Sequence, residues 1–283
     1  MASSKPMQWG LMLDAAWRAW AYCLHPRVMY LSLLPLLLAA VSLGLLSWLG
    51  WSDSVAAVRQ LLDDWGLSHA LLAWLDSAGL GALRAALVPL LLVIMAVPLV
   101  LMVCLLLVAG LMTPALVKLV RARRFPDLQA SQSTPWWQSL LWSLGATGVA
   151  ILVLLVSLPL WLFPLMAVIL PPLIWGWLTY RVMAFDTLAD LATPAERQEV
   201  LKQHRTTLLA MGVVCGYIGA APAALWALGA WTVLLAPLLI VASVWLYTLV
   251  FAFSSLWFAH YLLPVLQASR HEPASPTALQ DKT

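Results

Sequence analysis

The sequence predicts an all-α fold: a polytopic helical membrane protein with six hydrophobic segments. Of its 283 residues, 63% are hydrophobic and only 10% are charged, whereas a soluble domain has about one quarter charged residues. A soluble fold needs charge to cover its surface, so this deficit indicates a surface that faces lipid. The 17 tryptophans favour the same conclusion, because tryptophan is enriched at membrane interfaces.

Two early apolar runs are each long enough to span a bilayer, and neither contains a charged residue. The first is Val28 to Trp51 and the second is Ala85 to Val117. As a helix, the second run would be about 50 Å long, against a hydrocarbon core of about 30 Å. We therefore expect it to tilt, to project beyond the bilayer, or to kink at Pro89 or Pro98.

Two later apolar runs are each too long for one span and divide into helical hairpins. Gln138 to Tyr180 is expected to turn near Phe163 to Pro172, where prolines accumulate. Leu208 to Leu263 is expected to break at Pro222 and Pro237. With the two early spans, the hairpins give the six segments.

Amphipathic stretches flank these spans. Before the first span, apolar residues share one helical face, and Asp14 and Arg18 form an i,i+4 pair elsewhere on the helix. The apolar face comprises Trp9, Leu13, Trp17, Trp20 and Leu24. This pattern predicts an interfacial helix on the inner leaflet. The segment from Ser52 to Arg84, with helix-start residues Ser54 and Ser68, is expected to lie flat on the outer surface.

The loop from Arg181 to Thr207 contains a specific helix-start signal. Thr193-Pro194-Ala195-Glu196 is a capping box with proline at the first helical position, so we predict a helix that runs from Pro194 into the next hydrophobic segment. The loop also carries equal numbers of basic and acidic residues. These are Arg181, Arg197, Lys202 and Arg205 against Asp186, Asp190, Glu196 and Glu199. We interpret the loop as a salt-bridged, solvated face rather than a substrate site.

The distribution of Lys and Arg predicts the orientation. With the N-terminus inside, only Arg59 and Arg84 fall on the outer side. The other thirteen fall on the inner side: Lys5, Arg18, Arg27, Lys118, Arg121, Arg123, Arg124, Arg181, Arg197, Lys202, Arg205, Arg270 and Lys282. Positive charge accumulates on the cytoplasmic side of membrane proteins. We therefore predict a bacterial inner (plasma) membrane protein with both termini cytoplasmic.

The predicted domain organisation is simple. Residues 1–27 form a cytoplasmic interfacial helix, and residues 28–266 form a single membrane domain. Residues 267–283, rich in Ser, Pro and Ala, form a disordered cytoplasmic tail.

The sequence contains few residues in patterns typical of catalysis. The sequence has no HExxH, GxSxG, Walker or GxGxxG motif. Cys23, Cys104 and Cys215 are far apart and are interpreted as inert buried thiols. His260 is the one histidine inside an apolar run, and we interpret it as a packing residue because no Asp or Glu lies in the runs to partner it. We therefore predict a protein that is not an enzyme and that has no cofactor and no metal site.

The same absence of charge limits how a solute could pass. None of the apolar runs contains Asp, Glu, Lys or Arg, whereas proton-coupled transporters place a carboxylate at mid-membrane. A solute would have to be held by hydroxyls, backbone groups and helix ends. The hairpin turns near Phe163 to Pro172 and Gly229 to Pro237 could supply such ends, or they could be ordinary loops.

Five residues make up the candidate anion path: Thr113, Thr179, Arg121, Arg123 and Arg124. The threonines would supply hydroxyls, and the arginines would form an inner vestibule. Simpler interpretations remain open for both groups. Ser and Thr are common at membrane helix interfaces, and a basic cluster can reflect topology and contact with anionic lipid.

Four stretches together resemble the etoposide-induced-protein family, whose bacterial branch includes the CysZ sulfate permeases. They are His25-Pro26-Arg27 followed by Leu34-Pro35, Gly110 to Pro114, Tyr180-Arg181 through Asp186, and the helix from Pro194 that leads into a Gly- and Pro-marked pair. The resemblance covers roughly residues 10–266. The chain departs from the family pattern at Leu24 to Arg27, which lacks a glycine, and at Val117-Lys118, where an acidic residue is expected.

The resemblance implies two long spanning helices and two hairpins that enter the membrane partly or fully. It also implies oligomerisation and sulfate uptake. Our leading hypothesis is a permease or channel for a small anion, with sulfate as the candidate, acting by passive or weakly coupled transport. The alternative is a non-transporting scaffold or assembly factor, and a membrane enzyme is a third, disfavoured hypothesis. The expected partners are membrane lipid, a small anion and further copies of the chain, and no nucleic acid.

Overall fold

The computed structural model describes residues 5–64, 77, 81–131, 136–220 and 236–271. Every regular element in these ranges is helical, which confirms the all-α prediction. The predicted segments correspond to helices α2 (Pro26–Leu49), α5 (Gly81–Arg124), α6 (Trp136–Ser157), α7 (Pro164–Leu188), α9 (Arg205–Gly219) and α11 (Ala236–His271). Five of the six are long and apolar enough to cross a membrane. The exception, α9, is a shorter apolar helix.

The chain forms two compact units, which we describe separately. One comprises Leu33–Val108 and the other comprises Met1–Ser32 with Ala109–Thr283. The first contains most of α2 (Pro26–Leu49), the helix α3 (Trp51–Asp64) and the first part of α5 (Gly81–Arg124).

Helix α5 continues without interruption through Pro89 and Pro98, where a kink was one of the three alternatives expected. Its 44 residues correspond to roughly 66 Å of helix, so it is longer than a bilayer is thick. A proline removes one backbone hydrogen bond. It need not end a lipid-facing helix, because the remaining polar groups would find no water to replace their helical partners. The predicted helix start at Ser68 lies outside the described residues.

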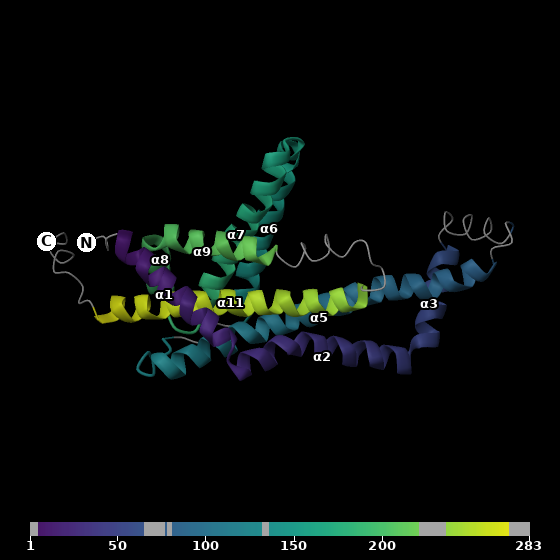
Figure 1. The fold of residues 1–283 in the computed structure, drawn as a ribbon, viewed down its shortest axis with the longest axis horizontal. Coiled ribbons are helices and arrows are strands. Elements are labelled where there is room, and N and C mark those ends of the chain that lie inside the picture. Colours follow the sequence, from purple (N-terminus) through teal and green to yellow (C-terminus); the bar gives the residue numbers. More distant parts are fainter. Residues whose placement is uncertain (1–4, 65–76, 78–80, 132–135, 221–235, 272–283) are drawn as a thin grey trace. The chain divides into compact units, whose positions relative to one another are not determined.

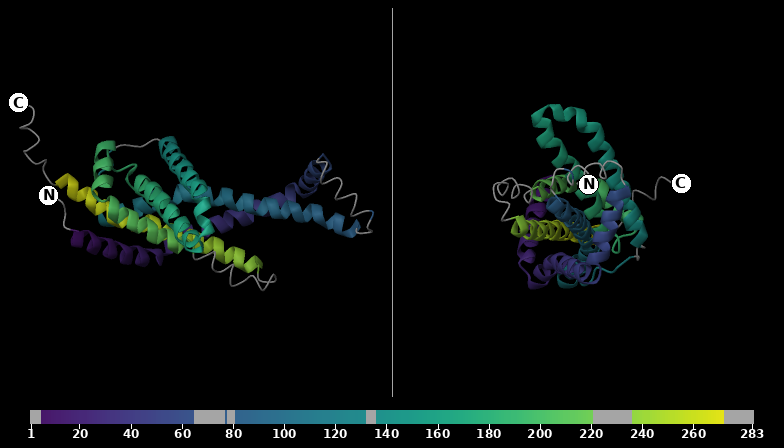
Figure 2. Two further views of the ribbon diagram at one scale, coloured as in Figure 1. Left: turned by 90° about the horizontal axis from the view of Figure 1, so that it is seen from above. Right: turned by 90° about the vertical axis from the view of Figure 1, so that its right-hand side faces the viewer.

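The second unit is built around α11 (Ala236–His271). Helix α1 (Lys5–Cys23) runs alongside it, as the views in Figures 1 and 2 agree. Its small residues Ala15 and Ala19 face α11 and are buried, and the indole of Trp257 donates to the Met12 carbonyl at 2.9 Å. The predicted apolar face of α1 points outward, with Trp17 exposed by 73%. Its contact with lipid remains a prediction.

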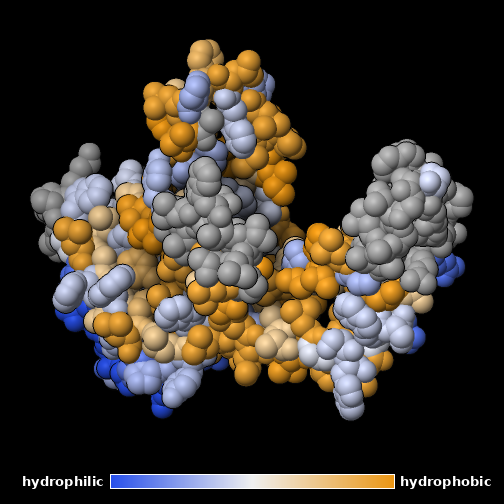
Figure 3. Space-filling model, turned by 45° about the vertical axis from the view of Figure 1, so that its right-hand side comes forward, coloured by the Kyte–Doolittle hydropathy of each residue, from blue (hydrophilic) through white to orange (hydrophobic). Residues whose placement is uncertain are grey.

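Helices α6 (Trp136–Ser157) and α7 (Pro164–Leu188) pair as a hairpin. The turn is a short 3₁₀ segment, Leu158–Leu162, which ends at the extended residue Phe163. The expected turn extended to Pro172, and this was wrong: Pro171 and Pro172 lie inside α7. Apolar side chains cover much of the hairpin, as a surface facing lipid requires (Figure 3).

The capping box at the start of α8 (Pro194–Gln203) is confirmed. The Thr193 hydroxyl accepts from the Glu196 backbone N–H at 3.2 Å, and the Glu196 carboxylate accepts from the Thr193 N–H at 2.8 Å. The prediction that this helix continues into the next hydrophobic segment was wrong. It breaks at His204, whose Nδ1 forms a 2.8 Å hydrogen bond with the Tyr261 hydroxyl, and α9 (Arg205–Gly219) begins there.

Arg270, in the last turn of α11, joins three segments of this unit. Its Nε and Nη2 donate to the two carboxylate oxygens of Glu196 at 2.9 and 3.1 Å. It also donates to the carbonyls of Leu191 at 2.6 Å and Gln129 at 3.1 Å. One guanidinium therefore fixes the α7–α8 connection, the start of α8 and the segment after α5. Helix α11 extends through His271, so residues 267–271 of the predicted disordered tail are helical, and this part of the prediction was wrong. The rest of the predicted tail, residues 272–283, lies outside the described residues.

The ion pair between Arg270 and Glu196 predicts a pH-dependent contribution to stability. Hydrogen bonds from Arg270, and then from Thr193, hold the pKa of Glu196 at about 2, below its ordinary 4.5. A depressed pKa stabilises the fold above pH 4.5, and this contribution is lost as the pH falls from there toward 2. Because the two side chains keep 25% and 31% of their surface exposed, we expect about 1 kcal/mol from the ionised pair.

Thermal unfolding of the detergent-solubilised protein tests this prediction. Glu196→Gln should melt a few degrees below the native protein at neutral pH, and the difference should shrink as the pH falls below about 4. Glu199→Gln, which removes an exposed carboxylate on the same helix, is the matched control. An equal effect of both substitutions would contradict the assignment.

Candidate functional site

The centre of the larger unit is a close contact between the backbones of α7 and α9. A Cβ atom placed on Gly176 would lie 2.5 Å from the Val213 Cα, and one on Gly216 would lie 2.8 Å from the Pro172 carbonyl oxygen. A Cβ on Gly212 would meet the Gly176 carbonyl oxygen and, at 2.8 Å, the Tyr180 Cβ. Only glycine fits at these three positions. Gly212 and Gly216 form a GxxxG motif, which is typical of helix packing in membranes.

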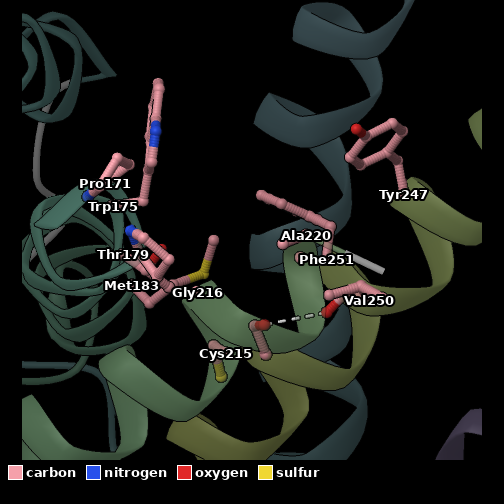
Figure 4. A pocket seen from close by; sticks show the side chains of 13 residues that line it. Pro171, Trp175, Thr179, Met183, Cys215, Gly216, Ala220, Tyr247, Val250 and Phe251 are labelled. Carbon is pink, nitrogen blue, oxygen red and sulfur yellow. Dashed lines mark hydrogen bonds between the residues drawn. The ribbon is translucent and has the colours of Figure 1, made fainter. Parts of the chain in front are cut away.

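Beside this contact lies a cavity of about 570 Å³ between α7, α9 and α11, called the central cavity below (Figure 4). Its walls are mainly apolar. One wall is α7, with Pro171, Trp175, Thr179 and Met183; the second is α9, with Cys215, Gly216 and Ala220; the third is α11, with Tyr247, Val250 and Phe251. Gly216 and Gly219 leave the α9 side of the cavity without bulky side chains.

The polar groups of the central cavity are neutral. No Asp, Glu, Lys, Arg or His is among the described residues that line it. Ser254 contributes a hydroxyl, but its proton is already donated to the Val250 carbonyl at 2.9 Å. The remaining donors are the hydroxyls of Thr179 and Tyr247 and the indole N–H of Trp175. These groups can donate hydrogen bonds to an anion without carrying a charge themselves.

Of the two threonines in the candidate anion path, only Thr179 lines this cavity. Thr113 lies on α5 and is buried, with its hydroxyl 3.2 Å from the Ser255 hydroxyl of α11. Its role in the structure is to join two helices, which matches the simpler interpretation of membrane hydroxyls.

The three arginines of the candidate path have different surroundings. Arg121 lines a second cavity of about 240 Å³ together with Lys118, Asp186 and Asp190. Arg123 lies 2.9 Å from a ring nitrogen of His25, and the guanidinium of Arg124 lies over the Phe125 ring at 5.5 Å. Arg121 is therefore in a cavity of mixed charge.

Helix α7 also carries ionisable residues beyond the expected end of its apolar run at Tyr180. The helix continues to Leu188 and includes Arg181 and Asp186. The Asp186 carboxylate accepts a 2.5 Å hydrogen bond from the Ser139 hydroxyl of α6, so it ties the two arms of the hairpin together.

The loop that was expected to be a salt-bridged face is arranged otherwise. Its four basic residues, Arg181, Arg197, Lys202 and Arg205, line a third cavity of about 580 Å³ that no described carboxylate lines. The acidic residues point elsewhere: Glu196 pairs with Arg270, and Asp186 and Asp190 line the second cavity. The prediction failed because equal numbers along a sequence do not place opposite charges side by side.

The described residues contain no group of three or more His, Cys, Asp or Glu side chains that could hold a metal ion. His260 lies on α11 and is buried. Its Nδ1 lies 3.2 Å from the Leu256 carbonyl, and its ring packs edge-on against Tyr22 at 4.7 Å. This geometry fits the packing role expected of it.

Two features of the site escaped the sequence interpretation. The GxxxG motif on α9 was readable, and it would have indicated the close contact with another helix. The third cavity had no comparable signal, because its basic residues come from α7, α8 and α9 and are interspersed in the sequence with acidic residues.

Comparison with known proteins gives one match. The sequence model of the family described as "Sulfate transporter CysZ/Etoposide-induced protein 2.4" matches residues 15–228. No curated protein and no solved structure matches significantly.

The glycine contact predicts a sharp difference between two similar substitutions. Gly212→Ala should destabilise the protein by about 1–3 kcal/mol, because the new methyl group must push the α7 backbone away. Gly148→Ala, on α6, should be neutral or stabilise by up to about 1 kcal/mol, because nothing lies within 4 Å of the new methyl group. Thermal unfolding in detergent measures both. Equal melting temperatures for the two variants would show that α7 and α9 are not in contact at Gly212.

Proposed function

The chain belongs to the sulfate transporter CysZ/etoposide-induced protein 2.4 family, and from this premise we propose that it is a permease for a small anion. Sulfate is the first candidate substrate. The family match covers most of the chain, including the first span, α5, both arms of the first hairpin, α8 and α9. We propose passive or weakly coupled transport and no enzymatic activity.

The observation that carries the proposal is the central cavity within the apolar helices. It is large enough for a small oxyanion, and its free donors are neutral: Thr179, Tyr247 and Trp175. Neutral donors can stabilise an anion in a membrane protein without the cost of burying a fixed charge. They also bind it weakly enough to release it, which conduction requires.

We propose that Arg121, Arg123 and Arg124 raise the local anion concentration at the inner side. Their effect would be long-ranged rather than a direct contact, and it would weaken with salt as the screening length falls to about 3 Å at 1 M. The mixed charge around Arg121 reduces its share of this effect. No Asp, Glu, Lys, Arg or His is among the described residues of the central cavity, so flux would follow the gradient of the anion itself.

Flux of labelled sulfate into proteoliposomes tests the proposal. Thr179→Val should reduce the rate by about two- to tenfold, because one neutral hydrogen bond is lost. Thr147→Val, which removes a hydroxyl from α6 outside the central cavity, should leave the rate unchanged. The triple substitution of Arg121, Arg123 and Arg124 by Gln should reduce flux at low salt and have little effect at high salt.

Three outcomes would count against this mechanism. Accumulation of sulfate against its gradient when protons flow inward would show proton coupling. Equal losses in the two threonine variants would show that the central cavity is not the path. Absence of flux for sulfate, phosphate and chloride, with folded protein, would favour the scaffold hypothesis instead.

We further propose a multi-pass protein of the bacterial inner membrane with both termini cytoplasmic and several copies per assembly. The unequal distribution of Lys and Arg supports this orientation. A reporter fused within residues 52–84 should signal from the outer side, and a C-terminal reporter should signal from the cytoplasm. A cytoplasmic signal within residues 52–84 together with an external C-terminus would refute the orientation.

A further inference from the structure

The third cavity, called the basic cavity below, is lined by four basic residues that are not part of the candidate anion path. Arg181, Arg197, Lys202 and Arg205 line it, no described carboxylate does so, and none of the four forms an ion pair with another described residue. Like charges repel when brought together, and Arg197, the one buried cation of the four, also loses hydration. A cavity with this lining therefore favours an anion.

Aromatic rings hold two of these cations in place. The guanidinium of Arg181 lies 4.5 Å from the centre of the Trp142 ring, and that of Arg197 lies 4.1 Å from the centre of the Phe185 ring. Trp142 and Phe185 themselves stack at 4.8 Å with an angle of 16°. Contact with the rings occupies a face of each guanidinium and leaves its N–H edges free to donate.

Some of these N–H groups are buried and have no hydrogen-bond partner among the described residues. They are Nε of Arg181 and Nη1 of Arg197. Arg197 as a whole is only 8% exposed. Burial alone lowers the pKa of Arg197, as expected where no carboxylate lies close enough to offset the loss of hydration. Buried donors normally find a partner, so these two point to a ligand that supplies acceptors.

The position of the cavity along the membrane-spanning helices indicates which kind of ligand it could bind. Arg181 and Phe185 lie in the last turns of the α7 span, Trp142 lies near the start of α6, and Arg197 and Lys202 lie on the polar helix α8 beyond the spans. The cavity is thus at the membrane–water boundary, where tryptophan and arginine meet phosphate headgroups. A guanidinium group has five N–H donors, and two of them on one edge can bind two oxygens of a phosphate group.

We propose that the basic cavity binds a phosphate group, supplied by the headgroup of an anionic phospholipid or by free phosphate. Arg181 and Arg197 donate to its oxygens from their free edges, and Lys202 and Arg205 add charge at the more exposed side. This site is separate from the central cavity and does not depend on transport. Its occupation stabilises the junction of α6, α7, α8 and α9, because it removes the repulsion among the four cations.

The test measures binding and stability on the full-length purified protein. Thermal unfolding is recorded in phosphatidylcholine vesicles, in the same vesicles with phosphatidylglycerol added, and in phosphatidylcholine vesicles with inorganic phosphate. The double variant Arg181→Gln, Arg197→Gln is compared with Arg27→Gln, Lys118→Gln, which removes two cations that do not line the cavity. Native mass spectrometry measures the affinity for phosphatidylglycerol in each variant.

The native protein should gain stability from phosphatidylglycerol or from inorganic phosphate. The Arg181, Arg197 double variant should bind the effective ligand at least about tenfold more weakly, because charge-assisted hydrogen bonds are lost. The control double variant should bind like the native protein. Stabilisation by phosphatidylglycerol alone identifies a lipid headgroup, and equal stabilisation by inorganic phosphate identifies the free anion.

Two results would overturn the proposal. One is the absence of stabilisation and of binding by either ligand in the native protein. The other is an equal loss of affinity in both double variants, which would show that only net charge matters. If the Arg181, Arg197 variant does not fold, Arg181→Lys with Arg197→Lys keeps the charge but removes the planar edge donors, and it should still bind at least severalfold more weakly.

Discussion

The close approach of the α7 and α9 backbones at three glycines is the contact on which the larger unit depends. In lipid, helices gain little from hydrophobic burial against one another, so tight van der Waals packing between small residues carries much of their association. Gly176, Gly212 and Gly216 allow this approach. The central cavity lies beside this contact, between α7, α9 and α11. At the cytoplasmic end predicted by the charge distribution, the same crossing brings the ends of α7 and α9 beside α8 and forms the basic cavity.

Polar interactions then fix the end of the unit where the spans stop. Arg270 spans the last turn of α11, the cap of α8 and two loop carbonyls, so one side chain satisfies acceptors that would otherwise need water. His204 breaks the helix between α8 and α9 and is held by Tyr261 of α11. Asp186 and Ser139 join the arms of the hairpin. Each of these interactions links segments far apart in sequence, and together they orient the polar helix α8 against the apolar bundle.

The cavities separate two kinds of anion chemistry. The central cavity offers neutral donors in an apolar surrounding, which suits weak and reversible binding. The basic cavity offers fixed cations held by aromatic rings at the membrane boundary, which suits tight binding of a structural ligand. A single sequence can hold both because Arg181 lies in the last two turns of α7 and the other cations lie on α8 and at the start of α9, away from the middle of the apolar helices, where burying a charge would cost much more.

Much of this fold follows from the sequence alone. Runs of apolar residues without charge have to become helices in lipid, because no other local structure satisfies the backbone, and so the six hydrophobic segments could be predicted. The capping box at Thr193 and Glu196 could be predicted because all of its partners lie within four residues. Thr179 could be named as a hydroxyl on a span, although not as part of a cavity.

The tertiary structure decided what depends on contacts between distant residues. Proline could not locate the hairpin turn, since Pro171 and Pro172 are tolerated inside α7 and the chain turns earlier, at the 3₁₀ segment before Phe163. The acidic and basic residues of the α7–α9 region are equal in number, yet Glu196 pairs with Arg270, and Arg181 and Arg197 lie together in a cavity that no described carboxylate lines. Sequence patterns report local periodicity and composition. Which charge faces which depends on helix crossing angles, and these are set by packing between segments that the sequence does not place side by side.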